Sequence, residues 1–147
     1  MELSEDNKKA LLLSVHKAIE EFAGDTTDNL FHNRTNMLIS YPPNGGLTES
    51  EKEALGQLKE SEVLKSALRK VIASTTADVF FDFFNIVDGT TEPDTGIWSE
   101  VLIIDKPNDF EEYREFLHDS FFETYWDWKE IRNNTNWSLD LSEEVEK

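Results

Sequence analysis

Cysteine is absent from this 147-residue chain, and basic side chains are scarce. Without cysteine the chain can form neither a disulfide framework nor a thiolate metal site, and it has no thiol nucleophile. The 14 Lys and Arg residues are opposed by 31 Asp and Glu residues, which gives a formal net charge of −17. Nucleic acids and anionic membranes are bound through clustered Lys and Arg, so we expect neither as a partner.

Long apolar runs are missing as well. The N-terminus is acidic, and its one apolar run, Ala10–Leu13, is far too short for a signal peptide or a membrane span. The expected compartment is therefore the cytoplasm. Aromatic residues make up 12% of the chain, which argues against disorder. We expect one globular domain over residues 1–140 and a frayed acidic tail over 141–147.

Apolar residues recur at helical spacing over most of the chain. Gly24 is expected to end the first helix, and the Thr48/Glu51 spacing predicts a capping box at the start of the second. Ser61 is the expected cap of the third helix, which is apolar nearly all round in its second half and so belongs in the centre of a core. The expected helices cover about residues 4–23, 48–59, 62–87 and 110–132.

Two short segments have the composition of strands. Residues 97–104 are rich in β-branched side chains and partly alternate between apolar and polar, and residues 35–41 are a weaker candidate. The expected fold class is therefore helix-rich α+β: about four helices with one or two short strands in a single domain.

The negative charge is concentrated in the second half of the chain. Residues 1–75 hold 12 acidic and 9 basic side chains, for a net charge of −3, whereas residues 76–147 hold 19 and 5, for a net charge of −14. Six acidic and no basic residues lie between Asp78 and Glu100. A charged face of this kind is either a solvated surface that maintains solubility or a docking surface that steers a basic partner.

Tryptophan residues accompany this charge, and aromatic side chains beside acids are typical of interface anchors. Each tryptophan could equally be an ordinary packing residue. If the surface binds a basic protein, the predicted contact residues are Asp88, Glu92, Asp94, Trp98, Glu100, Glu123, Trp126 and Asp127.

A metal site or a small enzyme is the alternative hypothesis. Glu115 and His118 have the Glu-x-x-His spacing that places two ligands on one helix face, and His16 and Glu20 could supply a second pair. Di-iron bundle proteins carry that motif twice with two further glutamates, whereas this chain carries it once. Asp78 and Asp82, one turn apart, are a possible carboxylate pair for acid–base chemistry. No cofactor is required by any of these patterns.

One part of the chain resembles a segment of small acidic bacterial proteins. The residues that carry the resemblance are Leu64–Ala73, then Phe80–Gly89 with its Asp-Gly ending, then the tryptophan-containing segment Trp98–Ile104. Some proteins of this kind are immunity proteins that neutralise a toxin. Together with the charge distribution, the resemblance leads us to expect a non-enzymatic, acidic protein-binding module of the bacterial cytoplasm. Its most concrete form is an immunity-type inhibitor whose acidic C-terminal half covers the basic active site of a toxin or enzyme.

Overall fold

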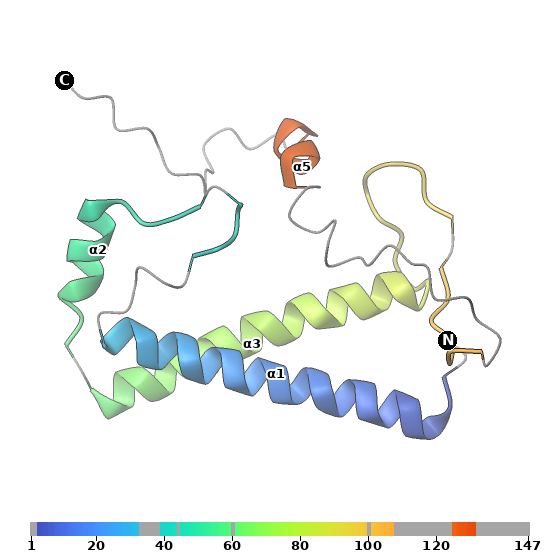
Figure 1. Ribbon diagram of the computed structural model, residues 1–147, viewed down its shortest axis with the longest axis horizontal. Helices are drawn as coiled ribbons and strands as arrows, with labels where there is room; N and C mark the ends of the chain where they lie inside the picture. Colours follow the sequence, from blue (N-terminus) through green and yellow to red (C-terminus); the bar gives the residue numbers. More distant parts are fainter. Residues whose placement is uncertain are drawn as a thin grey trace. The chain divides into compact units, whose positions relative to one another are not determined.

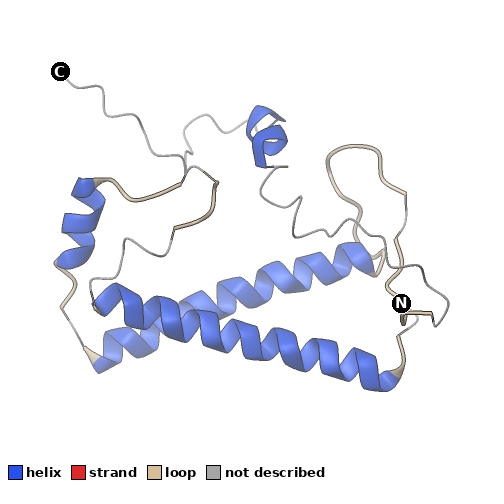
Figure 2. Cartoon of the chain, in the orientation of Figure 1, coloured by secondary structure: helices blue, strands red, loops and turns tan. Residues whose placement is uncertain are grey.

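The fold is helical. The computed structural model describes residues 3–32, 39–43, 45–59, 61–99, 101–107 and 125–131. Its helices are α1 (Glu5–Phe31), α2 (Glu49–Gly56), α3 (Glu62–Val87) and α5 (Tyr125–Ile131) (Figure 1). Within these described ranges no strand is present (Figure 2). The expectation of an α+β fold is therefore wrong, and the error lies in the strands.

The segment with the best strand composition, residues 97–104, is largely exposed and forms no strand in its described part. Ile97 is fully exposed, and Val101, Leu102 and Ile104 are each about half exposed. Favourable β-propensity reflects packing on a half-buried sheet surface, and a strand needs a hydrogen-bonded neighbour. The weaker candidate is no strand in its described part either: residues 39–43 are irregular, and residues 35–38 lie outside the described part of the chain.

By internal contacts the chain divides into two compact units. Unit 1 comprises Met1–Thr27 with Ser61–Glu111, and unit 2 comprises Asp28–Glu60 with Glu112–Lys147. Nearly all of α1 and the whole of α3 belong to unit 1, where they run antiparallel (Figure 1). Gly24 of α1 lies near the side chain of Arg69 on α3: an added Cβ atom would lie 3.9 Å from its Nε, an ordinary contact distance.

Helix α1 continues past Gly24 as far as Phe31, so the expected stop at the glycine is wrong. The buried residues of the helix explain the continuation: Ile19, Ala23 and Thr27 form one stripe at four-residue spacing that crosses the glycine. The Thr27 hydroxyl donates to the Ala23 carbonyl oxygen at 2.7 Å. A glycine inside a helix costs only about 1 kcal/mol, which packing along a stripe of this kind offsets.

The sequence-predicted start of α2 and both predicted ends of α3 are confirmed, whereas α2 ends at Gly56, earlier than expected. The Thr48 side chain accepts a hydrogen bond from the Glu51 backbone N–H, and a Glu51 carboxylate oxygen accepts one from the Thr48 N–H at 2.7 Å. Ser61 caps α3 by accepting from the Leu64 N–H. At the other end, Asp88 is the C-cap and Gly89 follows with φ of 72°, a conformation that glycine adopts without steric cost.

The second half of α3 is not the centre of a core. Val87 is buried, but Val79 and Phe81 are each about two-thirds exposed and Phe83 is 45% exposed. Among the described residues the buried hydrophobic side chains are Ile19, Ala23 and Val87. Two paired helices cannot enclose a helix that is apolar on every side, because each helix covers only one face of the other.

The last expected helix is seen only in part. Helix α5, Tyr125–Ile131, falls within the predicted range of 110–132. The rest of that range lies outside the described residues. None of the described helices is both long and apolar enough to cross a membrane.

Candidate functional site

The stretch from Asp88 to Asp105, called the acidic segment below, is hydrogen-bonded to the end of α3. The backbone N–H groups of Thr90 and Thr91 both donate to the Asn85 carbonyl oxygen, at 2.9 and 3.2 Å. The Thr90 hydroxyl lies 3.0 Å from the same oxygen and 3.0 Å from Oδ1 of Asn85. Gly96, with φ of 82°, provides a second turn further along. The chain therefore leaves α3 in a defined direction.

The predicted contact residues in this segment are presented to solvent. Asp88, Glu92 and Asp94 are exposed, and Trp98 is 37% exposed. None of these acids takes part in any of the ion pairs found among the described residues. Glu100 lies outside the described residues. The structure thus places four of the predicted contact residues along one short exposed segment of unit 1.

Asp105 holds the far end of this segment against the start of α1. Its carboxylate accepts a hydrogen bond from the Asn7 side-chain amide at 2.8 Å and from the Ser4 backbone N–H at 3.3 Å. These hydrogen bonds, that of Asn7 above all, hold the pKa of Asp105 below its ordinary value because they stabilise the ionised form. The acidic segment is therefore anchored within unit 1 at both ends.

The remaining predicted contact residues belong to unit 2. Trp126 and Asp127 lie on α5, where Trp126 is 43% exposed and Asp127 is exposed. Glu123 lies outside the described residues. The structure does not join these residues to the segment that begins at Asp88, so their membership of one surface stays a prediction.

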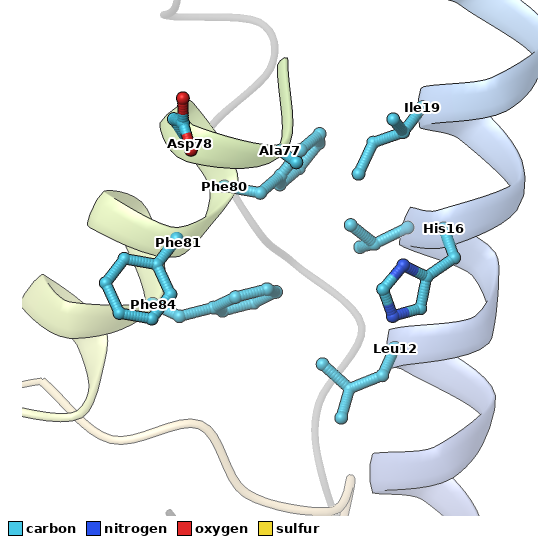
Figure 3. Close-up of a pocket in the computed structure, with 9 residues that line it drawn as sticks. Leu12, His16, Ile19, Ala77, Asp78, Phe80, Phe81 and Phe84 are labelled. Atoms are coloured by element: carbon cyan, nitrogen blue, oxygen red, sulfur yellow. The ribbon is translucent and has the colours of Figure 1, made fainter. Parts of the chain in front are cut away.

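An apolar groove runs between α1 and α3 in unit 1. It has a volume of about 370 Å³, and Figure 3 shows Phe80 and Phe84 of α3 directed across it toward Leu12, His16 and Ile19 of α1. The two phenylalanine rings lie 6.3 Å apart, centroid to centroid, which is within the range of favourable aromatic contacts. The described residues that line the groove are Leu12, Val15, His16, Ile19, Ala77, Asp78, Phe80, Phe81 and Phe84.

A smaller hollow of about 310 Å³ continues this groove toward the end of α3. Leu12 and Phe84 line both hollows, and Lys8, Leu11 and Asp88 complete the second. Asp88 therefore belongs both to the groove and to the exposed acidic segment. The apolar groove and the acidic segment therefore meet at Asp88.

The groove was not predicted from the sequence as a site. Phe80 and Phe84, in the half of α3 that was expected to be the centre of a core, here line an open groove. A signal for it was nevertheless present: the second half of α3 is apolar on more faces than one partner helix can cover. Such a helix needs a second neighbour or leaves an apolar surface exposed.

The metal and carboxylate alternatives gain no support from the geometry. His16 and Glu20 are both exposed on α1, and Asp78 and Asp82 are exposed on α3. Across the described ranges, no group of three or more His, Asp or Glu side chains is arranged to hold a metal ion. Glu115 and His118 lie outside those ranges, so the composite site with His16 and Glu20 stays a prediction.

No protein-family model, no curated protein and no solved structure matches the chain. The resemblance to small acidic bacterial proteins therefore rests on the residues alone, and the function has to be argued from the site.

Proposed function

We propose that this chain is a non-enzymatic, acidic protein-binding module that covers a basic surface of another protein. In its most specific form it is an immunity-type inhibitor of a basic toxin or enzyme in the bacterial cytoplasm. The observation that carries the proposal is the exposed acidic segment beside α3, in which Asp88, Glu92 and Asp94 accompany the partly exposed Trp98.

The electrostatics of the segment support binding to a basic protein. No Lys or Arg occurs between Asp78 and Glu100, so the field of this part of the chain has a single sign. A concentrated field raises the rate of association with an oppositely charged protein by about 10- to 1000-fold. Trp98 adds an aromatic side chain to this charged surface, and tryptophan is enriched among the interface residues that contribute most to binding energy.

Anchoring of the segment favours a preformed binding surface. The hydrogen bonds to Asn85 at one end and to Asp105 at the other restrict the segment before any partner arrives. A surface that is already ordered loses less conformational entropy on binding than a free loop, so more of the contact energy remains as affinity.

The association rate at several ionic strengths tests this proposal. The tagged chain retrieves its partner, which is identified, purified and mixed with the untagged chain under stopped flow. We expect a basic partner and an association rate that falls steeply with added salt, because the Debye length shrinks to about 8 Å at 0.15 M. An acidic partner, or a rate that does not change with salt, contradicts the proposal.

A further inference from the structure

The groove between α1 and α3 exposes apolar side chains that the two helices do not bury against each other. Phe81 is 67% exposed at its edge, and Leu11 and Leu12 are 37% and 39% exposed along the opposite wall. Isolated apolar residues on a surface require no explanation, but contiguous ones mark interaction sites. Here they line two hollows that share Leu12 and Phe84 and so form one channel.

The shape of the channel suits a helix. Its walls are two antiparallel helices of 27 and 26 residues, and a third helix laid between them would complete a three-helix core. Amphipathic helices are commonly recognised in this way, through apolar side chains at three- and four-residue spacing that enter a hydrophobic groove. Phe80 and Phe84, themselves four residues apart, provide matching contacts on α3.

The charged side chains around the groove indicate whether a basic or an acidic helix would bind there. Asp78 and Asp88 line the two hollows, and Asp82 is exposed on the same half of α3. Among the described residues, the one Lys or Arg that lines either hollow is Lys8, whose ammonium group lies 2.6 Å from a carboxylate oxygen of Glu5. Charge complementarity therefore favours a basic ligand, and a second copy of a chain with a net charge of −17 would be repelled.

We infer that the α1–α3 groove binds an amphipathic, basic helix of the partner protein. The apolar stripe of that helix contacts Leu12, Phe80 and Phe84, and its Lys or Arg side chains lie beside Asp78 and Asp88. The inference rests on the proposed function, because it supplies a second contact with the same basic partner. Asp88 belongs to both surfaces, so one partner can contact the groove and the acidic segment together.

A synthetic peptide tests the groove without knowledge of the partner. The probe is an amphipathic helix of Lys and Leu, about 14 residues or four turns long, and its control carries Glu in place of Lys. Affinity is measured by calorimetry for the full chain and for two matched variants, Ala77→Lys and Ala67→Lys. Ala77 lines the groove, whereas Ala67 is exposed on α3 about 15 Å away along the helix and lines neither hollow.

We expect the Lys/Leu peptide to bind and the Glu/Leu peptide not to bind. Ala77→Lys should weaken binding by about tenfold or more, or about 1.4 kcal/mol, since it places a cation and a long side chain in the groove. Ala67→Lys should weaken it much less, although the net charge changes equally. Phe81→Ala should also weaken binding. Because Phe81 is mostly exposed, this variant stays informative even if Ala77→Lys fails to fold.

Three results would overturn the inference. The first is the absence of any binding of the Lys/Leu peptide. The second is an equal loss in Ala77→Lys and Ala67→Lys, which would show attraction by net charge alone. The third is a dimer in sedimentation equilibrium that Ala77→Lys dissociates and Ala67→Lys does not, which would make a second copy the occupant. Each leaves the proposed function standing if the partner still associates at a salt-dependent rate.

Discussion

The side-chain amide of Asn7 donates a hydrogen bond of 2.8 Å to the carboxylate of Asp105, across 98 residues of sequence. This contact joins the first turns of α1 to the end of the segment that carries the acidic surface. The position of that surface in unit 1 therefore depends on a polar contact as well as on the end of α3. Neither residue stands out in the sequence, because a pair so far apart leaves no local pattern.

Replacing Asn7 should raise the pKa of Asp105. The hydrogen bonds lower this pKa in the folded chain, so they stabilise the fold at pH values above the unfolded-state pKa, about 3.9. That contribution is lost as the pH falls through the lowered, folded-state value. In Asn7→Ala the Asp105 pKa should move back toward its ordinary value, measured by NMR titration of the side-chain carboxyl carbon.

Asn29→Ala is the control for this titration, because Asn29 lies on the same helix, about 33 Å further along its axis. It should leave the Asp105 titration unchanged. If Asn7→Ala and the control give the same Asp105 pKa, the hydrogen bond does not anchor the segment in solution.

Two glycines should respond to alanine in opposite directions. Gly24 lies inside α1 with room for a methyl group, so Gly24→Ala should stabilise the chain by about 0.5–1 kcal/mol. Gly89 has a positive φ, so Gly89→Ala should destabilise it by about 1 kcal/mol. Chemical unfolding measures both. Destabilisation by Gly24→Ala would mean that α1 ends at the glycine, as the sequence alone suggested.

The capping box of α2 gives a further stability prediction. Thr48→Ala removes the oxygen that accepts from the Glu51 N–H, and N-cap losses of this kind cost about 1 kcal/mol. The pKa of Glu51 is lowered by its hydrogen bonds with Thr48, so it should rise in the same variant. Ser50→Ala, an exposed change in the same helix, should have little effect on either quantity. Faster amide exchange across α2 in Thr48→Ala alone would confirm the cap.

The local signals of the sequence predicted much of the helical structure. The caps at Thr48 and Ser61 and the end of α3 at Asp88 depend on side-chain and backbone chemistry within a few residues, and all three are confirmed. The error at Gly24 arose because tertiary packing decides whether a helix crosses a glycine. The false strand at 97–104 arose similarly, because β-propensity without a neighbouring strand forms no sheet.

The candidate site, too, was predictable where it depends on local sequence and not where it depends on the packing of distant elements. Exposure of Asp88, Glu92 and Asp94 follows from the run of acidic side chains, and the sequence indicated it correctly. The groove could not be located in advance, because periodicity shows that a helix face is apolar but not whether another element covers it. The choice between core and binding surface for Phe80 and Phe84 required the arrangement of α1 and α3.

The most direct test of the central claim is the association rate of two double charge-reversal variants with the partner protein. Glu92→Lys with Asp94→Lys changes the exposed acidic segment, whereas Asp25→Lys with Glu53→Lys changes the net charge equally at exposed helical positions outside it. At low salt the first variant should associate about tenfold more slowly than the second, and the difference should shrink as salt is added. Equal rates for the two variants at every ionic strength would contradict the assignment of this segment as the docking surface.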